Sequence, residues 1–357
     1  MNPRATLLVL TITTAITAAC SSEDSSTPAG ASTAGSGGSH QGGSGAVGPS
    51  GSGASSTSAG GGGANAGGTG GAPDPGPNVD TSDPQLYSVD FKPNDADPDA
   101  TQALGTQPAY LDTRVTPLGR LVVYLHGAGA PSTCGSPTHE QVLAGLGYHV
   151  LGPCYVSDYG VDNCGDDIEG CRLEAFEGVD HHPFVDITPP NSIEVRVAKG
   201  LAYLQTKNPE GDWTYFLDGD KPKWSRIIVS GISHGASSSG VIGLHRLVDR
   251  VVMLSGPLDT GQAWLKKATL TPIDRFFGFT HTADQQHAGH LQAFEDMQMI
   301  GDPTSVDGAS APYGGSHRLE TSAPTSDGHS SLQAGGTSPK NGSDWVFLPA
   351  WQDLYVP

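Results

Sequence analysis

The chain has 357 residues, of which 50 are glycine, and it carries 18 basic and 37 acidic side chains for a formal net charge of -19. Because nucleic-acid binding depends on clusters of Lys and Arg that meet the phosphates, this acidic balance argues against a nucleic-acid partner. The glycines also lack the strict triplet repeat of collagen. What is left is a globular protein with glycine-rich parts.

Residues 1–20 have the pattern of an export signal. Arg4 gives a positive start, and residues 5–19 form an apolar, Thr-containing run without charge. At about 15 residues this run is too short for a membrane-spanning helix, which needs about 20. The run ends in Thr-Ala-Ala-Cys at Cys20, which resembles the lipobox of bacterial lipoproteins, although Thr17 stands where that family usually has Leu. The alternative is cleavage after an Ala-x-Ala type site, which would release a freely secreted protein.

Residues 21–80 form a Gly/Ser-rich segment. It contains 19 Gly and 13 Ser, and it has no Lys, no Arg and no aromatic side chain. Such a composition cannot build a core and is typical of a flexible spacer. Ser21 after Cys20 resembles the sorting pattern of lipoproteins of the Gram-negative outer membrane. We therefore expect a protein lipid-anchored at the bacterial outer membrane or cell surface, and otherwise secreted.

Residues 81–357 form one domain, because they hold all 24 aromatic side chains together with 17 basic and 33 acidic ones. Short apolar runs alternate here with helical patterns. The expected strands cover 86–91, 109–114, 120–125, 148–152, 226–229, 250–254, 275–280 and 317–321, and the expected helices cover 140–146, 192–205, 236 to about 247, 261–268 and 287–299. This alternation predicts an α/β fold with a mainly parallel central sheet and helices on both faces.

Four cysteines lie in this domain. Export makes disulfides the expected state, and three pairings are open in principle. Cys164 and Cys171 flank a short acidic stretch, so we expect them to pair, which leaves Cys134 for Cys154. The alternative, a metal site built from all four thiolates, lacks the usual Cys-x-x-Cys spacing.

Residues 153–190 are a long acidic insertion that carries three of these cysteines and the pair His181-His182. A disulfide would make this insertion rigid, and the insertion could then line one side of the active site. A calcium or zinc site is the alternative, but the spacing of its acidic and histidine side chains matches no metal-binding motif. We expect no metal and no cofactor.

The strongest chemical signal is GISHG at residues 231–235. It satisfies Gly-x-Ser-x-Gly between an apolar strand and a helix, the context that exposes a nucleophilic serine on a sharp turn. The flanking glycines remove Cβ atoms that would clash in such a turn. Ser233 is therefore the expected nucleophile. The alternative is a structural turn in which Ser233 caps the helix.

With this motif the domain resembles the α/β-hydrolase superfamily over essentially all of residues 85–345, and its layout is similar to lidless esterases and cutinase-like enzymes. The resemblance implies a triad in the chain order serine, acid, histidine. Asp284, after the second strand beyond the nucleophile, is the expected acid, and Asp259 is the alternative. His329, in a Gly/Ser/Asp-rich loop after the last expected strand, is the expected base, and His317 is the alternative.

The resemblance also implies an oxyanion hole. His126-Gly127-Ala128-Gly129 follows a core strand, so the backbone N–H groups of Ala128 and His234 are the expected donors. A phosphate-binding loop is the alternative for residues 126–130, but the Lys-Ser/Thr pair of a P-loop does not follow.

Together these residues predict an exported serine hydrolase that cleaves carboxylic esters through an acyl-enzyme. The stretch between Gly256 and Ile273 is too short for an inserted lid, so we expect an open site. The alternatives are a serine peptidase or a carbohydrate acyl esterase with the same triad, or an inactive surface-displayed binding protein. We expect an ester substrate of unknown size, a monomer, and membrane contact only through the anchor.

Overall fold

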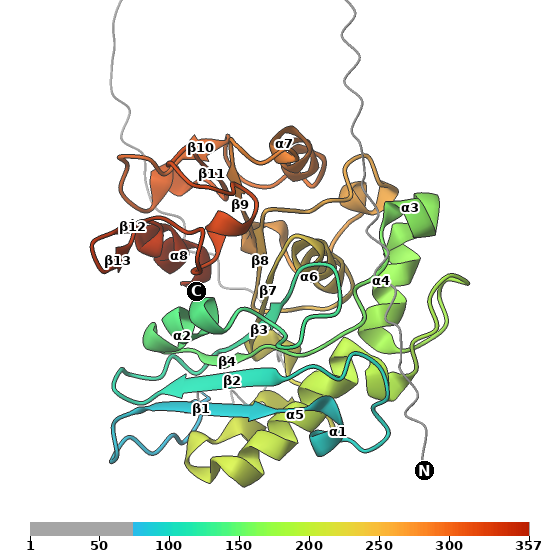
Figure 1. The fold of residues 1–357 in the computed structure, drawn as a ribbon, viewed down its shortest axis with the longest axis vertical. Coiled ribbons are helices and arrows are strands. Elements are labelled where there is room, and N and C mark those ends of the chain that lie inside the picture. The colour runs from blue at the N-terminus through green and yellow to red at the C-terminus, as the bar shows by residue number, and fades with distance from the viewer. Residues whose placement is uncertain (1–73, 357) are drawn as a thin grey trace, which may run out of the picture. The chain divides into compact units, whose positions relative to one another are not determined.

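The computed structural model describes residues 74–356 (Figure 1). The expected signal segment, Cys20 and all but the end of the Gly/Ser-rich linker lie outside these residues. Across residues 74–356, no helix has both the length and the apolar character needed to cross a membrane.

A nine-stranded sheet runs through the domain in the order β1-β2-β4-β3-β7-β8-β9-β11-β10. Its strands are β1 (Leu86–Phe91), β2 (Gln107–Asp112), β3 (Leu121–Leu125), β4 (His149–Leu151), β7 (Ile227–Ile232), β8 (Arg250–Leu254), β9 (Phe276–His281), β10 (Thr304–Ser305) and β11 (Arg318–Thr321). β2 is antiparallel to β1 and β4, and every other neighbouring pair is parallel. The carboxyl ends of the strands from β4 to β10 therefore lie at one edge of the sheet.

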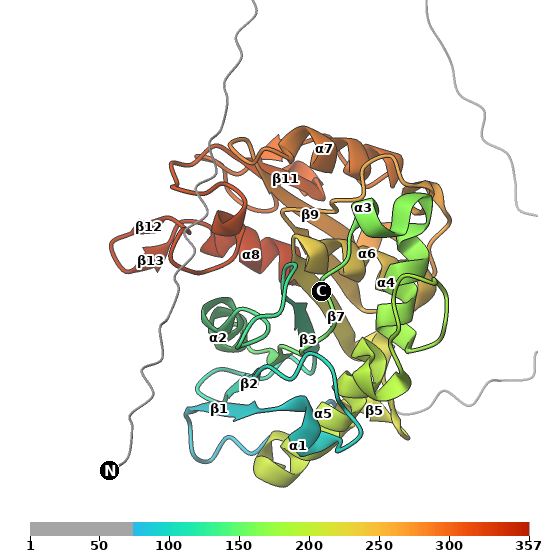
Figure 2. The same cartoon turned by 45° about the vertical axis from the view of Figure 1, so that its right-hand side comes forward.

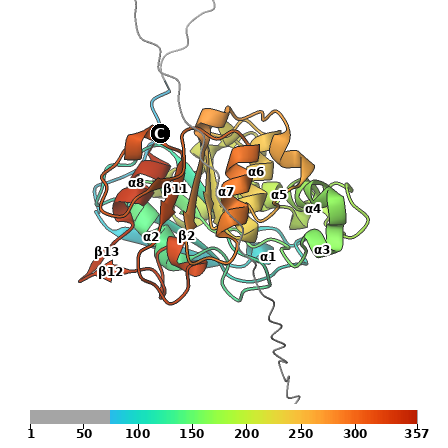
Figure 3. The ribbon, with the colours of Figure 1, turned by 90° about the horizontal axis from the view of Figure 1, so that it is seen from above.

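Helices cover both faces of this sheet (Figure 3). They are α1 (Pro93–Ala96), α2 (Pro137–Gly145), α3 (Val161–Cys164), α4 (Ile168–Glu177), α5 (Ile193–Lys207), α6 (His234–His245), α7 (His287–Asp296) and α8 (Leu348–Tyr355). One hydrophobic cluster joins the sheet to α4, α5, α6 and α7, and a second joins it to α2 and α8. Because both faces are covered, every residue of β3 and β7 is buried. The predicted α/β fold is confirmed.

Two small hairpins lie outside the main sheet. They pair β5 (Leu217–Asp218) with β6 (Lys221–Pro222), and β12 (Lys340–Asn341) with β13 (Asp344–Trp345).

The helix predicted over 261–268 was wrong. Only a single 3₁₀ turn forms there, over Ala263–Lys266. Soon after it the Leu270 and Thr271 N–H groups donate to the carbonyls of Leu244 and Gly243 at the end of α6. These hydrogen bonds hold the segment after Lys266 beside the end of α6, so the 3₁₀ turn does not continue as a helix.

The insertion contains α3 and α4, which the sequence analysis did not anticipate. Its local signals are those of a capped helix: the Asp167 side chain accepts from the Gly170 N–H at 3.1 Å, and Gly178 ends α4 with φ 70°. The structure contains the disulfides Cys134–Cys154 and Cys164–Cys171, the pairing that the sequence favoured. The second one ties α3 to α4.

Residues 74–80, at the end of the predicted linker, contact the domain. The Asp74 carboxylate lies 2.8 Å from Arg226 and accepts a hydrogen bond from the Tyr215 hydroxyl at 2.9 Å, and the Asp80 N–H donates to Glu210. Arg226 directly precedes β7, whereas Ser233 directly follows it. The described chain therefore enters the domain at the end of the sheet opposite to Ser233.

Candidate active site

Ser233 occupies the sharp turn between β7 and α6, with φ 59° and ψ -120°. A positive φ is strained for a residue with a Cβ and is characteristic of a nucleophile turn. The turn fits closely against the end of β3, because a Cβ on Gly231 would lie 2.6 Å, and one on Gly235 2.1 Å, from the Leu125 carbonyl oxygen. The Ser233 side chain makes no capping hydrogen bond to α6, so the alternative role as a helix cap is not observed.

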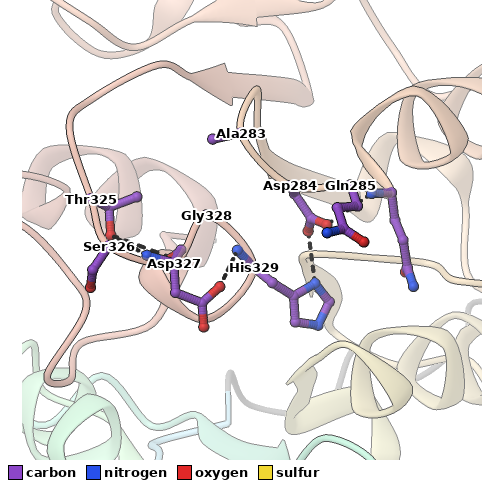
Figure 4. Close-up of a pocket in the computed structure, with 9 residues that line it drawn as sticks. Ala283, Asp284, Gln285, Thr325, Ser326, Asp327, Gly328 and His329 are labelled. Carbon is purple, nitrogen blue, oxygen red and sulfur yellow. Dashed lines mark hydrogen bonds and ion pairs between the residues drawn. The ribbon is translucent and has the colours of Figure 1, made fainter. Parts of the chain in front are cut away.

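Asp284 and His329 lie in hydrogen-bonding contact at the same edge of the sheet (Figure 4). Asp284 follows β9, His329 follows β11, and the His329 Nδ1 is 2.7 Å from the Asp284 Oδ2. The Asp284 side chain is 3% exposed and that of His329 is 31% exposed. With Nδ1 donating to the carboxylate, the second ring nitrogen, Nε2, is left as the proton acceptor.

Backbone contacts hold both side chains in place. The Asp284 Oδ1 accepts from the Gln286 N–H at 2.9 Å, and the His329 N–H donates to Asp327 at 2.9 Å. The Ser255 hydroxyl, at the end of β8, donates to the His329 carbonyl at 2.6 Å.

The end of β8 connects this pair to the turn that carries Ser233. The Ser233 N–H donates to the Leu254 carbonyl, and the next residue, Ser255, holds the His329 backbone. Within residues 74–356, no hydrogen bond joins the Ser233 hydroxyl to His329. Catalytic hydrogen bonds are often long in the absence of substrate and tighten in its complex.

The 126–129 loop lies directly beside Ser233. A Cβ added to Gly127 would be 3.5 Å from the Ser233 Cβ and 3.9 Å from its Oγ. The N–H groups of Ala128 and His234, the expected oxyanion donors, donate to no acceptor in the described part of the chain. The His126 Nδ1 is 2.7 Å from the Gly127 carbonyl oxygen, which braces the loop, and burial lowers the pKa of His126 to about 4.

The two alternative triad members lie in other environments. Asp259 forms a bidentate ion pair with Arg172, both at 2.7 Å, and accepts from the Trp264 indole at 3.0 Å. His317 precedes β11, and its ring stacks on Phe277 with 3.9 Å between centroids. It therefore lies toward the amino ends of the parallel strands, whereas Ser233 follows a carboxyl end.

Two surface hollows flank these residues. One of about 430 Å³ is lined by Asp284, His329 and polar side chains of residues 285–286 and 325–327. The other, of about 460 Å³, lies beside His126 and Ala130 and is lined by Leu104, Pro131 and Lys92, among others. For a metal, the described residues offer one cluster, Cys164, Cys171 and His182, and its two sulfurs are already joined in a disulfide.

Sequence reasoning did not single out Ser255, Tyr155 or Arg172. Their contacts reach across long stretches of chain, for example 87 residues from Arg172 to Asp259. No local sequence pattern predicts contacts between residues so far apart in the chain. A lone arginine in an acidic, disulfide-bearing insertion was the only available signal.

Comparisons with known proteins find similarity at the level of solved structures. No protein-family model matches the chain, and no curated protein matches it. An S-formylglutathione hydrolase from Agrobacterium tumefaciens is 13% identical, with a TM-score of 0.37 over 59% of this chain and 81% of that one. The esterase 2 of Thermogutta terrifontis is 12% identical, with a TM-score of 0.35 over 70% and 87%. A serine hydrolase without a lid from Xanthomonas campestris is 11% identical, with a TM-score of 0.33 over 66% and 82%.

The arrangement of strands, helices and the Ser233 turn defines the fold class of the domain. A mainly parallel sheet is covered on both faces, and a serine occupies a strained turn between a central strand and the helix that follows it. The turn follows the carboxyl end of its strand, as in the α/β-hydrolase fold. The domain has this fold.

Proposed function

We propose that the protein is a serine hydrolase that cleaves carboxylic esters through an acyl-enzyme. The observation that carries this proposal is the 2.7 Å hydrogen bond between Asp284 and His329 at the sheet edge where Ser233 occupies its turn. A carboxylate, an imidazole and a serine in that chain order form the usual triad of α/β-hydrolases.

In the proposed reaction the His329 Nε2 takes the proton of the Ser233 hydroxyl while the oxygen attacks the ester carbonyl. The oxyanion that forms accepts hydrogen bonds from the Ala128 and His234 N–H groups. His329 then gives the proton to the departing alcohol, which leaves an ester on Ser233. Water attacks this ester with His329 again as the base, while Asp284 holds the ring and stabilises its charged form.

Ester cleavage is the reaction to test first. Purified protein is expected to hydrolyse p-nitrophenyl esters, and the Ser233→Ala variant is expected to lose this activity. Short-chain against long-chain esters, and a p-nitroanilide as the amide control, define the acyl and leaving-group preference. Faster turnover of the anilide than of any ester would favour the peptidase alternative.

We further propose that the protein is exported and that the lipid anchor on Cys20 and the linker of residues 21–80 hold residues 81–357 at the cell surface. The two disulfides support an oxidising compartment. Metabolic labelling with a fatty-acid probe tests the anchor. Label is expected on the wild type and not on Cys20→Ser, and an unlabelled wild-type protein in the medium would support plain secretion instead.

A further inference from the structure

The insertion of residues 153–190 packs against the start of α6, the helix that begins directly after Ser233. Its helix α4 runs beside α6 (Figure 2). From this insertion Tyr155 and Arg172 reach the two backbone segments that carry the proposed oxyanion donors. The insertion is thus in contact with the nucleophile turn from the protein interior.

Arg172 makes the first of these contacts. Its side chain is 2% exposed, and its Nη1 donates to the His234 carbonyl at 3.3 Å and to the Ser238 hydroxyl at 3.2 Å. His234 is the first residue of α6. Arg172 therefore fixes the first turn of α6 through these two hydrogen bonds.

Asp259 holds Arg172 in that position. Two hydrogen bonds of 2.7 Å join its carboxylate to Nε and Nη2 of the guanidinium, which leaves Nη1 free to reach α6. Burial opposes the charged form, but the charge and hydrogen bonds of Asp259 outweigh it and raise the pKa of Arg172 above its usual value. The bidentate geometry fixes the orientation of the guanidinium plane, which a lysine could not reproduce.

Tyr155 makes the second contact and joins both donor segments. Its hydroxyl donates to the His126 carbonyl at 2.7 Å and lies 3.1 Å from the His234 Nδ1. Because the phenol proton goes to the carbonyl, Nδ1 of His234 carries the proton shared with the phenol oxygen. The 126–129 loop and the start of α6 are thus held at a fixed separation.

We propose that Arg172, oriented by Asp259, is a positioning residue of the active site that aligns the start of α6 so that the His234 N–H meets the oxyanion. This inference rests on the proposed function. It assigns the acidic, disulfide-bonded insertion a role in holding the oxyanion hole.

The test separates positioning from stability. Arg172→Met leaves the buried Asp259 carboxylate without its counter-charge, with only the Trp264 indole N–H as a partner, so it destabilises the fold as well. The double variant R172M/D259L removes both charges together, and such replacements of a buried ion pair are often neutral for stability. If Arg172 positions the oxyanion hole, the double variant folds but its kcat stays at least tenfold below wild type with KM within twofold.

A trifluoromethyl ketone supplies the second measurement. Ser233 adds through its oxygen to the ketone carbon, its proton passes to His329, and the resulting alkoxide occupies the oxyanion position. In R172M/D259L the inhibition constant of the trifluoromethyl ketone is expected to rise above the wild-type value by about the same factor as kcat falls. Arg246→Met is the matched control, because Arg246 forms the 2.8 Å ion pair with Glu177 of α4 at the far end of α6. It is expected to keep wild-type kcat and inhibition.

A double variant with wild-type kcat and wild-type inhibition would overturn the inference while leaving the hydrolase intact. A wild-type protein with no esterase activity would instead overturn the proposed function. Should the double variant fail to fold, Arg172→Lys replaces it, with kcat normalised to active sites titrated by a fluorophosphonate. Undiminished kcat per titrated site in R172K would then contradict the role of the bidentate guanidinium.

Discussion

At the scale of single residues, the two proposed partners in proton transfer are held in different ways. Ser233 is fixed by the backbone, since its positive φ places the side chain and two glycines allow the close approach of β3. His329 is fixed through hydrogen bonds, from its ring to Asp284 and from its carbonyl to Ser255. A loop residue is thereby given a defined ring orientation.

Replacing His329 tests the proposed base. His329→Ala is expected to lower kcat/KM by about a thousandfold or more, because the serine then lacks a proton acceptor. His317→Ala, remote from the turn, is expected to retain nearly all activity. Ester hydrolysis at pH 7 measures both, and the reverse pattern would contradict the assignment.

Replacing Asp284 and replacing Asp259 are expected to affect different properties, activity in the first case and stability in the second. Asp284→Asn lowers kcat by roughly 10²- to 10⁴-fold with little loss of stability, because the amide favours the wrong imidazole tautomer. Asp259→Asn leaves Arg172 without its counter-charge and is expected to lower the free energy of unfolding by about 3–5 kcal/mol. Urea unfolding measured beside kcat distinguishes them. Unchanged kcat in D284N would remove Asp284 from the proposed triad.

The sequence singled out the candidate residues of the site, which remain predictions, but not the residues that hold them in place. Ser233 and the 126–129 loop sit in local motifs, and the order along the chain selected Asp284 and His329, which the structure brings into contact. Ser255 and Arg172 act through partners far away in the chain. Their contacts arise only when the sheet edge is assembled.

At the scale of elements, periodicity predicted most strands and the long helices, because these depend on burial of a repeating apolar face. It failed for the one-turn helices α1 and α3 and for α4 and α8. The buried residues of α4, which include Arg172 and Glu174, lie around most of the helix and form no single apolar stripe, and α8 buries Trp351 and Leu354 against the second face only after the chain returns to the sheet. Over 261–268, hydrogen bonds to the end of α6 overrode local helix propensity.

The disulfides make an element-scale prediction. Cys134→Ser/Cys154→Ser opens a crosslink with a sequence separation of 20, and Cys164→Ser/Cys171→Ser one with a separation of 7. Loop-closure entropy gives losses of roughly 3 and roughly 2 kcal/mol in the free energy of unfolding. Urea titration of oxidised wild type against both double variants measures this. Equal stability of all three proteins would contradict the expected role of the crosslinks.

At the scale of the whole molecule, the domain buries several uncharged histidines. Burial lowers the pKa of His126 and His149 to about 4 and that of His139 to about 3, and it also lowers the pKa of His290 to about 4. Unfolding returns each ring to a pKa near 6.5, so the unfolded chain binds more protons below that pH. Glu140 acts in the opposite direction, because burial raises its pKa.

The stability that these four histidines contribute is therefore expected to be complete above pH 6.5 and to be lost as the pH drops toward 4, and it outweighs the opposite contribution of the single Glu140. Each of the four histidines contributes up to about 1.4 kcal/mol per pH unit over this range. Urea unfolding at pH 7 and pH 5 measures the loss, and a free energy of unfolding that stays constant between these values would contradict it. The fold class was predictable at this scale, but the burial of these rings was not, since histidine has no strong preference for core or surface.

Covalent labelling tests the central claim most directly. A fluorophosphonate probe reacts with a serine only when that serine is activated as a nucleophile, and mass spectrometry of the digested protein identifies the labelled residue. The proposed function predicts one adduct, on Ser233, with labelling abolished in Ser233→Ala and slowed in His329→Ala. An unlabelled wild-type protein, or equal labelling of Ser233→Ala, would contradict it.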